Sequence, residues 1–275
     1  MTTKLTVSEL KELSRKTRIH LLRMIHNAKS GHPGGSLSSV EILLTLYFHI
    51  MNTNLDDHDR DYFILSKGHS APLLYTVLME AGYIPKTLNQ LRKLGSILQG
   101  HPDALKTHGV ELSSGSLGNG LSIAAGVAAS IKLDERKSRV YCLLGDGECD
   151  EGLIWEGAMM AASKKLDNLT AIVDRNMFQI DGYTENVVCL EPFSDKWKAF
   201  NWNVLECNGH SFEELIKAFN VVAKYPNQPT VIIANTIKGK GVSFMENNAG
   251  FHGKAPNDEE LKLALKELGG PSNVV

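Results

Sequence analysis

The sequence predicts an α/β fold, with a mostly parallel central sheet and helices on both of its faces. In the second half of the chain, four short β-rich runs, "RVYCLLG", "LTAIVD", "NVLECN" and "PTVIIANT", alternate with longer helix-like runs. This alternation is typical of βαβ units, whose strands lie parallel. The chain has 275 residues, 43% of them hydrophobic, which is enough for one large core. Residues 1–275 contain no repeat or long linker, so they are interpreted as a single domain.

The amino-terminal residues predict a helical layer within that domain. Thr6 and Glu9 have the spacing of a capping box, and apolar residues recur at helical intervals from Leu10 to Gly31. A first helix is therefore expected to end near Ser30. The glycine- and proline-rich segment "SGHPGGSLSS" then breaks the pattern, and "VEILLTLYFHIM" predicts a second, largely buried helix.

The remaining elements follow in order along the chain. After a strand at "DYFILS", helices are predicted at "APLLYTVLMEAG", at the short run "TLNQLRKLG" and at "GLSIAAGVAASIK". Between the later strands, helices are expected at "LIWEGAMMAASKKL", "DKWKAFN" and "SFEELIKAFNVVAKY". In the first of these three, Trp155, Met159 and Met160 are interpreted as core or interface packing.

Composition and charge exclude several kinds of partner. Lys and Arg number 29 against 31 for Asp and Glu, which gives a formal net charge of −2. Without a basic tract, neither nucleic acid nor a membrane surface is an expected partner. The polar amino terminus and the lack of a long apolar run predict a soluble, cytoplasmic protein. The four cysteines lack the spacing of a zinc site.

Chemistry is expected in the loops that follow the strands. Three such loops, "SKGHSAP", "LGDGE" and "DRNMFQIDG", combine glycine with histidine or acidic residues. In parallel sheets, ligands bind outside the carboxyl ends of the strands. Asp146 and Asn176 follow two neighbouring strands there, and oxygen ligands together with a diphosphate suit Mg²⁺. The Walker, dinucleotide-binding and EF-hand patterns each fail at a required residue.

These loops resemble those of a known family. Gly145-Asp146-Gly147 followed by Asp174-Arg175-Asn176 resembles the thiamine diphosphate motif, although Arg175 replaces the asparagine usual in the general motif. The segments "SGHPGG", "LSKGHSAP", "LQGHPD", "SSGSLGNGLSIAAG", "GDGECDEGLIWEG" and "FHGKAPN" resemble the amino-terminal domain of transketolase, in the same order. The resemblance covers about residues 10 to 260 and implies the thiamine diphosphate-binding fold.

The resemblance implies a set of cofactor contacts. Asp146, Asn176 and the carbonyl of Phe178 would hold Mg²⁺, for which Ca²⁺ or Mn²⁺ could substitute. The other residues expected to bind thiamine diphosphate are His69, Gly115, Leu117, Gly147, Glu151 and His252, with Asn176 shared. Glu151 and Glu156 match glutamates that lie at the dimer interface of the family. Glu148 and Asp150 match nothing catalytic and are expected to be surface acids at a helix start.

The resemblance also implies catalytic and substrate residues. Four histidines that stand beside glycine or proline in loops match the sugar-handling histidines of transketolase: His32, His69, His101 and His252. Imidazoles can donate, accept or exchange protons near neutral pH, as ketose chemistry requires. His32 and His101 are expected to face the hydroxyls of the donor sugar. Lys67 and Lys254 are expected contacts of the substrate or its phosphate.

The implied function is transfer of a two-carbon ketol unit from a ketose phosphate to an aldose phosphate. In the family, a pyrimidine-binding domain supplies the glutamate that activates the cofactor, and no such glutamate can be placed in this sequence. The chain is therefore expected to act with a carboxyl-terminal transketolase subunit, as an α₂β₂ assembly. The alternatives are a deoxyxylulose-phosphate synthase-like subunit, a 2-oxoacid dehydrogenase α chain and a non-catalytic thiamine diphosphate-binding module. The sugar itself is left open, pentose phosphates included.

Overall fold

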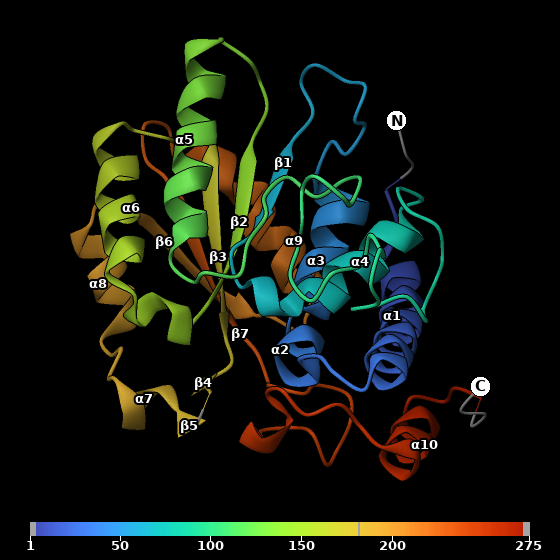
Figure 1. The fold of residues 1–275 in the computed structure, drawn as a ribbon. Coiled ribbons are helices and arrows are strands. Elements are labelled where there is room, and N and C mark those ends of the chain that lie inside the picture. The colour runs from blue at the N-terminus through green and yellow to red at the C-terminus, as the bar shows by residue number, and fades with distance from the viewer. Residues whose placement is uncertain (1–3, 181, 272–275) are drawn as a thin grey trace.

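A five-stranded parallel sheet forms the centre of the molecule (Figure 1). The computed structural model describes residues 4–180 and 182–271. The strand order is β1-β2-β3-β7-β6, and the strands are β1 (Tyr62–Leu65), β2 (Val140–Gly145), β3 (Leu169–Arg175), β7 (Thr230–Asn235) and β6 (Asn203–Asn208). A separate antiparallel pair joins β4 (Phe178–Gln179) to β5 (Gly182–Tyr183). The α/β fold with a mostly parallel sheet is thus confirmed.

Helices cover both faces of the sheet, as Figure 1 shows. One face carries α1 (Val7–Ala28), α3 (Val40–Thr45), α4 (Ala71–Glu80) and α9 (Phe212–Val221), with α10 (Asp258–Glu267) packed against α1. The other face carries α5 (Asn119–Leu133), α6 (Gly152–Ser163) and α8 (Phe193–Ala199). The short helices α2 (Pro33–Ser38) and α7 (Thr184–Val187) lie toward the carboxyl ends of the strands.

The alternation of side chains along each strand divides the core in two. In β2, Tyr141 and Leu143 pack into the cluster beneath α1, α3, α4 and α9. Cys142 and Leu144 point the other way, into the cluster beneath α5, α6 and α8. Because successive side chains of a strand face opposite sides, an uninterrupted apolar run is what a strand buried on both faces requires.

The amino-terminal layer forms as the sequence predicts. Thr6 and Glu9 make both hydrogen bonds of the capping box at the start of α1, and Lys29 closes the helix in the left-handed conformation. The second predicted helix is α3, continued by one π-helical turn at Leu46–Ile50. Together with α9, this layer covers one face of the sheet.

One prediction about local structure is wrong. The run from Thr87 to Gly95 forms turns rather than a helix, and it belongs to the connection 83–118, a fully described stretch without helix or strand. Arg92 and Gly95 both have positive φ values, which interrupt a helix. Of the residues in α6 expected to pack in the core or at an interface, Trp155 packs against the core, whereas Met159 and Met160 are exposed. No helix in the described ranges is long and apolar enough to cross a membrane.

Candidate functional site

Four histidines from four separate segments meet at the carboxyl edge of the sheet. The ring centroid of His32 lies 5.5 Å from that of His69, 5.4 Å from that of His252 and 6.4 Å from that of His101. His69 and His252 are 5.5 Å apart. His32 precedes α2, and His69 follows β1. His101 lies in the 83–118 connection, and His252 follows β7. The structure therefore brings together the four histidines that the sequence singles out.

The surroundings of this histidine cluster keep its imidazoles neutral. Burial, together with the charges of Arg92, His101 and Lys238, lowers the pKa of His32 to about 4. Burial and the Lys238 charge likewise lower the pKa of His252 to about 4. The pKa values of His69 and His101 are lowered by burial too. Each ring can therefore both donate and accept a hydrogen bond at neutral pH.

Acidification is expected to destabilise the fold through this cluster. A histidine whose pKa is lower in the folded chain stabilises the protein fully above the unfolded pKa, and loses this contribution as pH falls from about 6.5 toward 4. Between pH 7.5 and 5, the loss is about 1 kcal/mol for each of His32 and His252, after a discount for solvent screening. Urea unfolding at pH 7.5 and at pH 5 measures the change in the free energy of unfolding between the two pH values. This change should be smaller in the double variant His32→Gln/His252→Gln than in the wild type. The exposed His58, changed to Gln, serves as control, and an equal pH difference in all three proteins would contradict the assignment.

Lys238 belongs to the site, although it was not predicted from the sequence. It follows β7, is 1% exposed, and its Nζ lies 2.9 Å from Nδ1 of His252. Burial and the nearby Lys67 charge lower the pKa of Lys238 to about 8. The ammonium therefore places positive charge beside the histidine cluster. Its position in "NTIKGKG", just after a strand at the functional edge, is the pattern that could have identified it.

Asp146 and Asn176 lie side by side at the ends of β2 and β3. Asp146 is buried, and its two carboxylate oxygens accept hydrogen bonds from the amides of Gly147 (2.9 Å) and Met177 (2.6 Å). Oδ1 of Asn176 accepts from the amide of Phe178 at 3.1 Å. Burial and the neighbouring Asp174 raise the pKa of Asp146 to about 7, so this carboxylate lacks sufficient positive charge around it.

Arg175 connects this edge to the segment that follows it. Its guanidinium donates to Thr184 at 3.1 Å and to Glu185 and Glu191 at 2.9 Å each. It also approaches Oδ2 of Asp146 to 3.6 Å. The arginine that departs from the general motif thus anchors the β4–β5 hairpin and α7 beside the two candidate metal ligands.

Lys67 does not lie where the sequence places it. It is 1% exposed, and its ammonium donates to the carbonyl of Gly35, to the hydroxyl of Ser39 and to the carboxylate of Asp174. All three of its protons have partners inside the protein, so the expected direct contact with substrate is corrected to a structural ion pair beneath the site. Burial acts to raise the pKa of Asp174, but Lys67 and the hydroxyl donors outweigh it and lower the value.

Glu148 is also placed differently from the expectation. It is 2% exposed rather than a surface acid, and it accepts hydrogen bonds from Ser66, Gly118 and Gly145. A 3₁₀ turn at Gly147–Asp150 separates β2 from α6, and this turn directs the Glu148 side chain inward. Asp150 is only partly exposed.

The segment Gly115–Leu117 borders the histidine cluster. Gly115 has φ of +150°, and a Cβ there would lie 3.1 Å from Cδ2 of His101. A Cβ on Gly68 would lie 2.8 Å from the amide nitrogen of Gly115. Glu151 is exposed at the start of α6, against Gly118, and Glu156 is exposed on the same helix.

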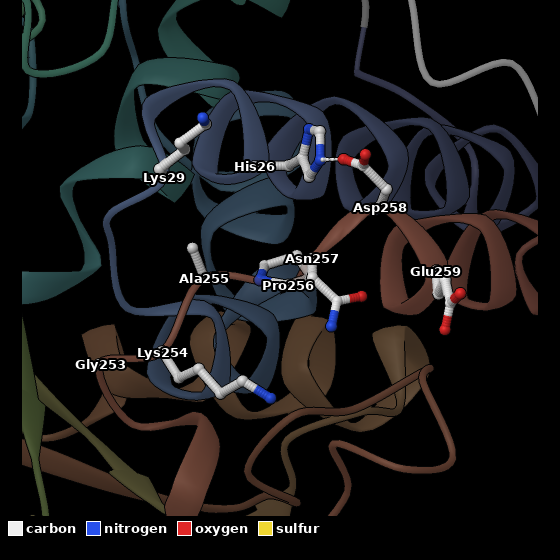
Figure 2. A pocket seen from close by; sticks show the side chains of 9 residues that line it. All are labelled: His26, Lys29, Gly253, Lys254, Ala255, Pro256, Asn257, Asp258 and Glu259. Carbon is white, nitrogen blue, oxygen red and sulfur yellow. Dashed lines mark hydrogen bonds and ion pairs between the residues drawn. The ribbon is translucent and has the colours of Figure 1, made fainter.

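Lys254 lies at the side of the site. Its ammonium pairs with Glu260 at 2.5 Å and stands 4.7 Å from the ring centroid of Phe251. It borders a cavity of about 690 Å³ between the end of α1 and the start of α10, where His26 pairs with Asp258 at 2.8 Å (Figure 2). None of the four clustered histidines lines this cavity. Lys254 thus has an ion-pair partner of its own and borders this cavity, two residues beyond His252.

Comparison with known proteins assigns the family. A family model described as "Transketolase, thiamine diphosphate binding domain" matches residues 10–273. The chain belongs to the transketolase family. The resemblance noted in the loop motifs is thereby confirmed for most of the sequence.

Several transketolase relatives are themselves subunits. The chain is 42% identical to an apulose-4-phosphate transketolase subunit of Phocaeicola vulgatus, over 95% of this chain and 94% of that one. It is 43% identical to the 6-deoxy-6-sulfo-D-fructose transketolase subunit SqwG of a Clostridium species, over 86% of this chain and 88% of the relative. The chain thus matches each of these subunits over most of its length.

A solved transketolase from Campylobacter jejuni has the same fold. The TM-score is 0.91 at 33% identity, and the match covers 98% of this chain. It covers 44% of the Campylobacter chain, so this chain spans less than half the length of that transketolase.

Proposed function

We propose that this chain is the cofactor-binding subunit of a two-chain transketolase. The observation that carries the proposal is the meeting of His32, His69, His101 and His252 beside the Asp146–Asn176 edge. A module that only held a cofactor would have no use for His32 and His101 beside the two histidines expected to receive the diphosphate. The assembly would transfer a two-carbon ketol unit from a ketose phosphate to an aldose phosphate.

The residues at the sheet edge fit a hard divalent cation. The carboxylate of Asp146, the amide oxygen of Asn176 and the carbonyl of Phe178 are oxygen donors of the kind that Mg²⁺ prefers, and Ca²⁺ or Mn²⁺ could take its place. Asp146 is 1% exposed and lies 3.6 Å from its nearest cationic group, Arg175, so a cation there would supply the missing charge. In the described part of the chain, no cluster of three His, Cys, Asp or Glu side chains offers an all-protein metal site. A diphosphate would therefore complete the coordination.

Thiamine diphosphate fits the same edge. His69, His252 and Gly147 would receive the diphosphate, with Lys238 adding positive charge beside His252. Gly115 and Leu117 would lie against the thiamine ring, and Glu151 would act at the contact between two active sites. When bound, the cofactor supplies an electron sink for the two-carbon unit. His32 and His101 would hold the sugar hydroxyls and exchange protons with them.

The substrate class follows from the relatives and the imidazoles together. The two subunit relatives are named for a sugar phosphate and a sulfonated sugar. Hydroxyl-rich sugars suit a cluster of imidazoles that both donate and accept hydrogen bonds. Pentose phosphates and branched or modified sugar phosphates belong to this class. The residues that bind the anionic end are assigned mainly to the partner.

The partner would be a carboxyl-terminal transketolase subunit that carries the pyrimidine-binding domain, in an α₂β₂ assembly. The test is native purification of the tagged chain from its source cells, followed by assays of the chain alone, the partner alone and the mixture. Ketol transfer between sugar phosphates is expected only for the mixture, in the presence of Mg²⁺ and thiamine diphosphate. Transfer by the chain alone would contradict the two-chain arrangement. Turnover of pyruvate instead of ketose would indicate a different thiamine diphosphate enzyme.

A further inference from the structure

One buried carboxylate lies behind the loops of the candidate site. Oε1 of Glu148 accepts from the hydroxyl of Ser66 at 2.5 Å and from the amide of Gly118 at 2.9 Å, and Oε2 accepts from the amide of Gly145 at 3.0 Å. All three donors are buried, as is Glu148 itself. Such charge-assisted bonds are stronger than bonds between neutral groups.

The three donors belong to three different segments of the site. Ser66 follows β1 and leads into the turn that carries His69. Gly118 is the N-cap residue of α5 and directly follows the segment Gly115–Leu117. Gly145 is the last residue of β2 and precedes Asp146. One carboxylate therefore joins the segments expected to hold the diphosphate, the thiamine ring and the metal ion.

Direct backbone contacts leave these segments little room to adjust. A Cβ on Gly120 would collide with the hydroxyl of Ser66, and a Cβ on Gly68 would lie 2.8 Å from the amide of Gly115. Gly118, the N-cap residue of α5, has φ of +87° and no side chain with which to cap the helix. The acceptor that its amide needs comes from Glu148.

We propose that Glu148 is a positioning residue of the cofactor site, which fixes the spacing between the segments that carry His69, Gly115–Leu117 and Asp146. This role rests on the proposed function, because it concerns the place where thiamine diphosphate would bind. It assigns the second acid of "GDGECDEG" a function that does not involve contact with the cofactor or the substrate.

Glu148→Gln is the substitution that best tests this positioning role. Glutamine has nearly the same shape but offers one acceptor oxygen, and its amide group would face a donor. At least one of the bonds to Ser66, Gly118 and Gly145 must therefore be lost. The exposed Glu259 of α10, changed to Gln, is the matched control for loss of a carboxylate.

The first measurement needs no cofactor. Backbone amide exchange of the full chain, followed by NMR, should become about tenfold faster at Gly118 or Gly145 in Glu148→Gln, because a hydrogen bond to a charged group is lost there. Central amides of β3 should keep their rates, which would show that the fold is intact. Unchanged exchange at both glycines would overturn the proposal, whatever the enzyme does.

The second measurement uses the chain assembled with its partner. Calorimetry and turnover both measure the half-saturating concentration of thiamine diphosphate. This concentration should rise at least about tenfold in Glu148→Gln, as it does when residues that orient metal ligands through hydrogen bonds are changed. Turnover at saturating cofactor should stay within about threefold. A role in stability alone would lower the thermal midpoint and leave that concentration unchanged, and this result would overturn the proposal. If the wild-type assembly binds no thiamine diphosphate, the proposed function fails and the positioning role fails with it.

Discussion

Changing Asp146 to asparagine is expected to reduce the Mg²⁺-dependent affinity for thiamine diphosphate by more than about 100-fold, the upper range measured for groups that only orient a metal ligand. The substitution removes the charge that a divalent cation requires and keeps the size of the side chain. Oδ2 of Asp146 accepts a hydrogen bond from the Met177 amide at 2.6 Å, so the change falls where the loops after β2 and β3 meet. Calorimetric titration of Mg²⁺ at fixed thiamine diphosphate, with the assembled protein, measures the effect.

Asp150 provides the matched control for this experiment. It ends the 3₁₀ turn Gly147–Asp150, which directly follows Asp146, and it is only partly exposed. Asp150→Asn should leave the affinity within about threefold, since no metal contact is assigned to it. Equal losses in both variants would refute the assignment of Asp146 as the ligand. Thermal midpoints without cofactor establish whether either chain is unfolded.

The second large effect is expected from the ion pair beneath the site. Lys67 and Asp174 are 1% and 0% exposed, and Lys67→Met would leave a buried carboxylate without its counter-ion. Removal of one partner of a buried pair costs about 3–5 kcal/mol of the free energy of unfolding. Urea denaturation of the full chain at pH 7.5 measures this loss.

Two further variants separate the charge from the packing. Lys67→Met combined with Asp174→Asn removes both charges, and should recover part of the loss if the unpaired carboxylate is its cause. Lys198 pairs with Asp195 at 2.9 Å on the surface, with 61% and 67% of the two side chains exposed. Lys198→Met should therefore cost no more than about 1 kcal/mol. A loss that small for Lys67→Met would show that the buried pair does not stabilise the fold.

Periodicity and turn chemistry were sufficient to predict the five strands of the central sheet and most helices, but not α2, α7, α10 or the β4–β5 pair. The β2 and β3 runs are largely apolar, and the α1 capping box is local in sequence, so short-range patterns carry the information. The 87–95 run fails because its apolar spacing is helical while Arg92 and Gly95 adopt positive φ, which a side-chain pattern does not report. The gathering of the four histidines follows from their loops at one sheet edge, and their interpretation depended on the family resemblance.

The missed features all depend on contacts between distant segments. Glu148 stands beside three other acids in sequence, and only the turn after β2 brings it against Ser66 and Gly118. Lys67 meets Asp174 across the sheet, so its burial cannot be read from "SKGH". Lys238 approaches His252 by way of a loop that follows β7. Local sequence places a residue at an edge, whereas its hydrogen-bond partners are set by tertiary packing.

The strand order also has a consequence for the path of folding. Val140 of β2 pairs with Leu169 of β3, and Asn203 of β6 pairs with Thr230 of β7, each across one short crossover. Tyr62 of β1 pairs with Val140 only after the chain has closed a loop more than twice as long. Because long loops cost more closure entropy and form later, β2–α6–β3 and β6–α9–β7 should be the early units. Docking of β1, which precedes His69, is then a late step, so a nascent chain would acquire its ligand-binding edge only after most of its core exists.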